Sequence, residues 1–454
     1  MPEPQLQREL GLGAAASIVV GTVIGSGIFL VPKKMILEVG TPDLLLFVWI
    51  FGGLLSLAGA LTYAELASML PEAGGEYVFL REAYGPFWGF LYGWTQMWVA
   101  KAASIATLAT GFFYYLANFR PELERVLYAT HLPLLGLFEL RSGQLLAMVI
   151  ILGLGVVNCF GVRVGGGVQL FVTILKVLLI LGIVVIGLFG GAGHSANFST
   201  STPAHGGLAG FFAALVAALW AYDGWNNVSM VSSEIRNPQR NLPRALIFGT
   251  GLVVIIYLMT NVAYFHVLSA AEVGRSDRVA AEMMRRVAGD WGASAVSLAA
   301  MISIFAALNG SILSGARVPY AAAHDGLFFA PFRRVHPRYH TPGFSILALT
   351  VWSCVITLTG RYEQLFTLVI FPSWILYGLA TAAVIVLRRK RADLPRPYKT
   401  VLYPVMPVLF VLVAALLLGY TVANSPRESG IGLVLILAGV PFYLYWSRSR
   451  RARQ

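Results

Sequence analysis

Long apolar runs recur along the whole 454-residue chain, separated by short stretches rich in charge, glycine and proline. Each run has roughly the twenty residues that an α-helix needs to cross the hydrocarbon core of a bilayer. The pattern predicts twelve spans, with approximate limits 11–38, 43–68, 86–117, 143–160, 166–190, 208–231, 243–268, 293–316, 343–360, 363–387, 401–422 and 430–446. We therefore expect an all-α polytopic membrane protein with a single transmembrane domain, residues 1–454.

The first apolar run is interrupted at its centre by Gly25-Ser26-Gly27. Glycine lowers helix propensity and permits positive φ, so the helix is expected to unwind there. Freed backbone groups at membrane depth are costly unless they line a cavity or meet a ligand. The break therefore indicates a binding site, whose half-helix N-terminus would suit a carboxylate. The alternative is a packing seam of small residues, because Gly21 and Gly25 form a GxxxG pattern.

The sixth run is interrupted by a carboxylate, a glycine and two asparagines, at Asp223, Gly224, Asn226 and Asn227. An aspartate at the centre of a spanning helix costs about 2.5–3.5 kcal/mol on insertion scales. Asp223 is therefore expected to belong to a site, or else to pair with a lysine or cap a half-helix.

Two breaks lying five spans apart predict an inverted five-plus-five repeat with its site at the midplane. The first repeat is expected at about 11–190 and the second at about 208–387. The two remaining helices, within about 401–446, are then additions to the repeat.

Lys176 lies about ten residues into the fifth run, roughly 15 Å along a helix and half the thickness of the hydrocarbon core. Its ammonium cannot easily reach an interface, so it is expected to face protein. A fixed cation there could take the place of a coupling sodium ion, exchange a proton, or hold helices together in a salt bridge. Lys101, in the third run, is expected to be internal or to lie near a vestibule.

Composition agrees with a membrane protein: 57% of residues are hydrophobic, 12% are charged, and the mean hydropathy is +0.73. The basic residues behind the net charge of +12 lie mainly in the loops between the predicted spans, so this charge does not indicate nucleic-acid binding. More Lys and Arg fall on the side that holds both termini, which predicts cytoplasmic termini in the cell membrane. Only Cys159 and Cys354 occur, so neither a disulfide framework nor a metal site is expected. No Ser–His–Asp order, HExxH or P-loop is present, so we expect neither an enzyme nor a cofactor.

The chain resembles the amino acid–polyamine–organocation superfamily, and within it a prokaryotic-type member of the L-type transporters and heteromeric light chains. The resemblance runs almost end to end. Its markers are Gly21–Phe29, Tyr63-Ala64-Glu65-Leu66, Gly74-Gly75-Glu76-Tyr77, Lys176, Ala221–Asn226, Glu234–Pro243, Asn261–Phe265, Asn309-Gly310-Ser311 and Arg396-Pro397.

The resemblance implies a five-plus-five fold of the LeuT type, with an amino-acid substrate bound where the first and sixth helices break. Residues implied to receive the carboxylate are Gly25, Ser26 and Gly27. Residues implied to receive the ammonium are Ile24 and the carbonyls around Trp220, Ala221 and Asp223. Trp220 occupies the position of an aromatic gate. Lys176 matches a lysine that stands in for the second sodium site, with Ser311 near it on the eighth span.

The activity implied is sodium-independent exchange of cationic or neutral L-amino acids, or both. The alternative is a proton-coupled symporter that titrates Lys176 or Asp223. A receptor or scaffold would not require two opposed broken helices. Asp223 resembles the acidic residue of carriers of cationic amino acids and cystine, whereas many neutral carriers have glycine there. Residues 118–142 contain no cysteine, so no disulfide-linked heavy chain is expected, and the other partner is membrane lipid.

Overall fold

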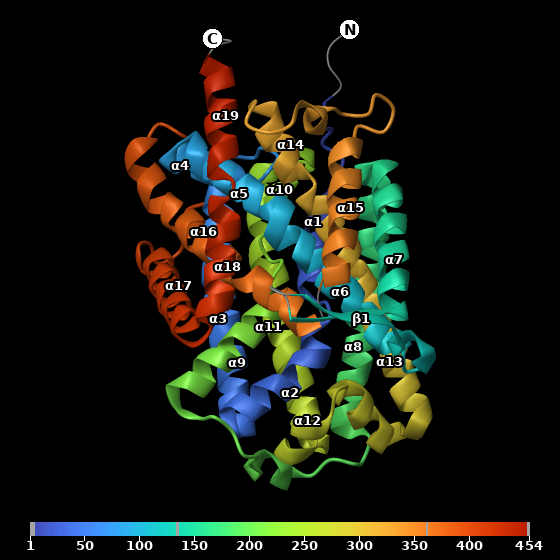
Figure 1. The fold of residues 1–454 in the computed structure, drawn as a ribbon. Helices are drawn as coiled ribbons and strands as arrows, with labels where there is room; N and C mark the ends of the chain where they lie inside the picture. Colours follow the sequence, from blue (N-terminus) through green and yellow to red (C-terminus); the bar gives the residue numbers. More distant parts are fainter. Residues whose placement is uncertain (1–4, 133–135, 360–361, 452–454) are drawn as a thin grey trace.

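The structure is a computed structural model that describes residues 5–132, 136–359 and 362–451. Most of these residues are helical (Figure 1). Among them, ten helices are long and apolar enough to cross a membrane, and two shorter apolar helices are α9 (Gly207–Tyr222) and α15 (Gly343–Thr359). These twelve follow the order of the twelve predicted runs. The expectation of an all-α polytopic membrane protein is confirmed.

The first half of the chain contains, in order, α1 (Leu12–Val23), α2 (Gly27–Val39), α3 (Pro42–Met69), α4 (Glu76–Tyr84), α5 (Pro86–Thr95), the π-helical segment η1 (Gln96–Ala100), α6 (Lys101–Leu116), α7 (Ser142–Cys159) and α8 (Val162–Phe189). The second half contains α9, α10 (Asn227–Met230), α11 (Pro238–Val267), α12 (Ala270–Arg275), α13 (Val279–Gly315), α14 (Arg317–His324), α15, α16 (Tyr362–Lys390), α17 (Val405–Asn424), α18 (Pro426–Leu437) and α19 (Val440–Arg451).

Helices five spans apart pack against one another. The second predicted span, α3, packs along the seventh, α11, while α6 of the third packs along α13 of the eighth. The same holds for α7 with α15, and for α2 with α9. Such pairing of equivalent helices from the two halves agrees with a five-plus-five inverted repeat of the LeuT type. The residue limits of the two repeats stay a prediction.

The first and last described residues lie at the same end of the molecule (Figure 1), which we call the terminal face. The short helices α4 and α14 lie toward this face, and α12 lies at the other end, the opposite face (Figure 1). Ser269 and Glu272 form a capping box at the start of α12.

Two local features differ from the sequence-based expectations. Helix α13 begins fourteen residues before its predicted span, and it kinks at Gly289, where φ is 68°. The loop after α6 contains an antiparallel hairpin, β1 (Val126–Leu132) and β2 (Gly136–Arg141), for which the sequence analysis assigned no strands. Residue 360, the predicted end of the ninth span, lies outside the described residues.

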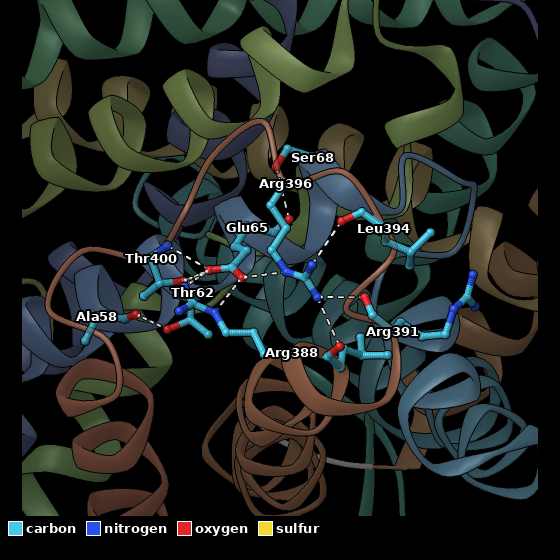
Figure 2. A network of polar contacts seen from close by, with 10 residues as sticks. Ala58, Thr62, Glu65, Ser68, Arg388, Arg391, Leu394, Arg396 and Thr400 are labelled. Carbon is cyan, nitrogen blue, oxygen red and sulfur yellow. Dashed lines mark hydrogen bonds and ion pairs between the residues drawn. The ribbon is translucent and has the colours of Figure 1, made fainter.

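The link between α16 and α17 is fixed to α3 through the buried carboxylate of Glu65 (Figure 2). Arg388 donates two hydrogen bonds to it, of 2.9 and 2.7 Å. The backbone N–H and hydroxyl of Thr400 add bonds of 2.7 and 2.8 Å, and Arg396 Nε lies 3.5 Å away. Two of the family markers, around Glu65 and Arg396, therefore meet in one polar cluster.

Candidate functional site

The first and sixth spans are both interrupted, and the two breaks lie side by side. Helix α1 ends at Val23 and α2 begins at Gly27, while α9 ends at Tyr222 and α10 begins at Asn227. Across the breaks, Thr22 Oγ1 lies 2.9 Å from the carbonyl oxygen of Gly224, to which it can donate. The local breaks that the sequence predicts are therefore present, and they are in direct contact.

A small cavity of about 20 Å³ lies between the breaks. Its lining combines residues of the two interruptions with side chains of α6 and α13. The lining residues are Thr22, Val23, Gly25, Ser26, Gly27, Ser104, Leu108, Trp220, Asp223, Gly224, Asn227 and Ser311. Of the residues named from the sequence, Gly25, Ser26, Gly27, Trp220, Asp223 and Ser311 are thus brought together around one space.

The glycines that flank Ser26 are required by close packing. A Cβ atom on Gly27 would lie 2.5 Å from the Cα atom of Ala221, and one on Gly25 would lie 2.9 Å from a methyl carbon of Leu108. Helix α2 starts here, and the first N–H groups of a helix lack the carbonyls four residues earlier that later N–H groups use. A helix N-terminus of this kind carries a partial positive charge and is suited to a carboxylate.

Ile24 and Ala221 lie beside the cavity but are not among its lining residues. The carbonyl oxygen of Ile24 accepts hydrogen bonds from Lys176 Nζ at 2.5 Å and from the Ser303 hydroxyl at 3.0 Å. The carbonyl oxygen of Ala221 lies 2.9 Å from the hydroxyl of Tyr257. Two of the carbonyls that the resemblance assigns to the substrate ammonium, those of Ile24 and Ala221, therefore already have protein donors.

Lys176 is fully buried, and its ammonium lies against the end of α1. Its Nζ donates to the carbonyl oxygens of Gly21 at 2.6 Å and Ile24 at 2.5 Å, and lies 3.4 Å from that of Ser303. A cation is favourable there, because the last carbonyls of a helix carry partial negative charge. The expectation that Lys176 faces protein therefore holds in the structure.

The residue of α13 that meets Lys176 is Ser303, and this corrects the expected placement of Ser311. The two serines are eight residues apart, about 12 Å along a helix. Ser311 instead lines the cavity between the breaks. The sequence showed that both serines share a span, but only packing decides which one lies at the level of Lys176.

The family model described as "Amino acid permease" matches residues 10–440. The chain belongs to the amino acid permease family. The members of this family are transporters of the amino acid–polyamine–organocation superfamily, and they are not enzymes. The resemblance noted from the sequence is therefore confirmed.

Several curated relatives match this permease over nearly its whole length. The serine/threonine exchanger SteT of Bacillus subtilis (strain 168) is 35% identical over 455 residues, 98% of each chain. The b(0,+)-type amino acid transporter 1 of Homo sapiens is 34% identical over 444 residues, 96% of this chain and 88% of the relative. The cystine/glutamate transporter of Homo sapiens is 31% identical over 452 residues, 98% of this chain and 87% of the relative.

The sequence analysis of the permease missed Tyr257 of α11. Its hydroxyl lies 2.8 Å from the carbonyl oxygen of Val23 and 2.9 Å from that of Ala221, so it joins the ends of both broken helices. A hydroxyl has one proton and can satisfy only one of these carbonyls fully at a time. A tyrosine at mid-span was the available signal, because a buried phenol normally needs a hydrogen-bond partner.

The side of the cavity that holds Asp223 has polar neighbours that the sequence did not pair with it. Tyr377 of α16 donates a hydrogen bond of 2.9 Å to Asp223 Oδ1. Lys101 follows directly after the π-helical segment η1, and its Nζ donates to Asn227 Oδ1 at 2.7 Å. Lys101 is also close enough to interact electrostatically with both Asp223 and Glu76. Lys101 is buried inside the protein, which is one of the two placements expected from the sequence.

The two faces of the permease differ in openness. Toward the terminal face, Arg317 and Glu234 form a fully buried ion pair. Beside it the chain before α1 is tied down, because the N–H of Leu10 donates to the carbonyl of Glu234 at 2.9 Å. Toward the opposite face lies a vestibule of about 1130 Å³, bordered by α2 and by residues 275–285. Among the described residues, the buried ion pair thus lies toward the terminal face and the vestibule toward the opposite face.

Proposed function

We propose that this permease is a sodium-independent exchanger of L-amino acids that works by alternating access. The observation that carries the proposal is the contact of the Lys176 ammonium with the carbonyls of Gly21 and Ile24. A positive charge built into the chain at this point removes the need for a metal cation there. The similarity to the serine/threonine exchanger SteT supports exchange in particular.

The substrate carboxylate is proposed to bind at the start of α2, above Gly25, Ser26 and Gly27. Support comes from the partial positive charge of this helix N-terminus and from the absence of side chains on the two glycines. The ammonium would then face Trp220 and the carbonyl of Ala221, sharing the latter with Tyr257. A carbonyl oxygen has two lone pairs, so it can accept a second donor. Trp220 would cover the bound substrate as an aromatic gate.

Asp223 is proposed to extend the substrate range to cationic side chains alongside neutral ones. It lines the cavity, and Tyr377 uses only one of its two carboxylate oxygens in the contacts described. A charge pair in a partly desolvated cavity contributes on the order of 1–3 kcal/mol, roughly tenfold in affinity or more. The similarity to the human b(0,+)-type transporter is consistent with this range.

We also infer the placement of the permease in the cell membrane. The excess of Lys and Arg near the terminal face supports cytoplasmic termini, so the vestibule would open outside the cell. The two cysteines support a light chain without a disulfide-linked heavy chain, because Cys354 is buried and Cys159 is partly buried. Both lie within predicted spans rather than in the loop that contains the hairpin.

Uptake of labelled amino acids into proteoliposomes tests the proposal. Exchange predicts fast uptake only when amino acid is present inside, with no change when sodium is replaced by potassium. Lys176→Ala should reduce uptake strongly, whereas Ser303→Ala, which keeps the carbonyl contact, should retain most of it. Strict dependence on sodium, or normal uptake by Lys176→Ala, would overturn the proposal. Uptake into empty vesicles driven by a proton gradient would establish the symporter instead.

Competition by arginine and by leucine or alanine tests the substrate range. Arginine should compete in the wild type and lose about tenfold or more in affinity in Asp223→Asn and Asp223→Gly. Leucine or alanine should compete in all three proteins. If arginine never competes, or competes equally in all three, Asp223 has a structural role and the cationic range is wrong.

A further inference from the structure

Glu76 is a buried carboxylate that transport, as proposed above, does not use. It is the first residue of α4, which lies between the second and third spans, and its side chain is fully buried. Asn226 Nδ2 donates to Glu76 Oε1, and the Ser229 hydroxyl lies 3.4 Å from Oε2. Glu76 is thus attached to the break that leads from α9 into α10, on the terminal side of the cavity.

The charged groups around Glu76 do not balance when all are ionised. Glu76 and Asp223 supply two negative charges, and Lys101 supplies one positive charge that interacts with both. The remaining titratable neighbours are phenols: Tyr63 of α3, Tyr92 of α5 and Tyr377 of α16. An uncompensated charge in a buried cluster is costly, and such a cluster ordinarily takes up a proton. Among the described residues, Lys176 is not one of the charges that interact with Glu76 or Asp223, and its ammonium lies against carbonyls of α1 instead.

A second observation also indicates that Glu76 holds a proton. Asn226 Oδ1 is fully buried, and among the described residues it has no hydrogen-bond donor. While its neighbour Glu76 is ionised, the carboxylate can accept hydrogen bonds but cannot donate one. When it is protonated, its O–H group can donate. Burial also raises the pKa of the Glu76 carboxyl. One proton on Glu76 would balance the charge count, and it would supply a donor on the residue that Asn226 already contacts.

We propose that Glu76 holds a proton while the cavity is empty or contains a neutral amino acid, and releases it when a cationic side chain binds beside Asp223. On release, the O–H bond of the Glu76 carboxylic acid breaks and the proton passes to water. The net charge of Glu76, Asp223 and Lys101 is zero before release. Afterwards it is minus one, which the substrate cation compensates. The second half of the proposal rests on the proposed binding of cationic side chains at Asp223, whereas the first half does not.

Infrared spectra of the purified full-length protein test the resting proton. The wild type at about pH 7 should show the carbonyl stretch of a buried protonated carboxylic acid. Glu76→Gln should lack this band, and Glu82→Gln, a matched change on the same helix at a surface ion pair, should retain it. Absence of the band in the wild type, or its persistence in Glu76→Gln, would overturn the proposal.

The charge count gives a second test that does not depend on Glu76→Gln folding. Asp223→Asn removes one negative charge, so Glu76 should ionise against Lys101 and the band should disappear. Lys101→Met removes the positive charge, and the band should persist to higher pH than in the wild type. A band that is unchanged in Asp223→Asn would show that the charges of this cluster do not determine whether Glu76 is protonated, which would overturn the proposal.

Titration with amino acids tests the release. Calorimetry in two buffers of different protonation enthalpy should show about one proton released for each arginine bound, and none for leucine. Arginine should also remove the infrared band. Arginine that binds without releasing a proton would overturn the second half of the proposal. If arginine fails to bind, the proposed substrate range is wrong, and the resting band still decides whether Glu76 holds a proton.

Discussion

Arg317 and Glu234 form a two-fold ion pair, with Nε–Oε2 and Nη2–Oε1 distances of 2.9 Å, and both side chains are almost completely buried. The pair joins α14 to the segment that follows α10. Because both side chains are shielded from solvent, each charge depends on the other for its stability.

Removing one partner of this pair should therefore lower the stability of the protein more than removing both. Arg317→Met alone leaves an uncompensated buried carboxylate and is expected to cost about 3–5 kcal/mol of stability. Arg317→Met combined with Glu234→Met should recover much of this loss. Thermal unfolding of the purified proteins measures the effect, with Arg333→Met, an exposed arginine of the same face, as the control. A double variant less stable than either single one would contradict the expectation.

Gly27→Ala should abolish transport with little loss of overall fold. The added methyl group would lie 2.5 Å from the Cα atom of Ala221, so α2 and α9 would have to separate at the cavity. Overpacking of this kind costs about 1–3 kcal/mol locally. Gly13→Ala, in the other half of the same broken helix, meets only Leu170 at 3.9 Å and should transport normally. Equal uptake by the two variants would show that the contact between the breaks can relax.

Tyr257→Phe should weaken substrate binding. The carbonyls of Val23 and Ala221 would lose their shared donor, and an unsatisfied buried acceptor costs on the order of 1–3 kcal/mol. We expect apparent affinity to fall roughly fivefold or more. Tyr264→Phe is the matched variant on α11, because its hydroxyl makes a longer bond of 3.3 Å to Ile28. It should have the smaller effect in the same uptake assay.

Glu65→Gln should loosen the link between α16 and α17. It would leave Arg388 and Arg396 beside an uncharged amide and remove a carboxylate that accepts several hydrogen bonds (Figure 2). A loss of about 3–5 kcal/mol is expected for a buried ion pair that loses one partner. The control is Arg389→Gln, because Arg389 is exposed and directly follows Arg388. This change should leave the stability within about 0.5 kcal/mol of the wild type. Hydrogen exchange of residues 391–404 provides a local measurement.

The start of α12 should loosen in acid. The hydrogen bond from Arg286, together with those from Ser269, lowers the pKa of Glu272 to about 2. A carboxyl whose folded pKa is depressed contributes stability above its unfolded pKa, near 4.5, and loses it as the pH falls toward 2. Exchange of the α12 amides should rise over that range in the wild type. In Glu272→Gln the same amides should exchange faster at neutral pH and show no further change.

Much of the candidate site could be predicted from the sequence because its elements are local. The breaks at Gly25-Ser26-Gly27 and near Asp223 follow from glycine and polar residues inside apolar runs. Lys176 was identifiable because a lysine at membrane depth must meet protein. None of these arguments depends on which helix faces which.

The amino-acid sequence by itself determined the membrane class, the order of twelve spans, the two interruptions and the buried ammonium, since hydrophobic length and backbone propensity act along the chain. Only the tertiary structure decided the partners. It placed Ser303 rather than Ser311 at Lys176, and it joined Tyr257 to both breaks and Tyr377 to Asp223. A hydrogen bond forms only within about 3 Å, and a shift of one helical turn is 5.4 Å. The rotation and register of packed helices therefore select each partner, and the apolar pattern of a single helix does not encode them.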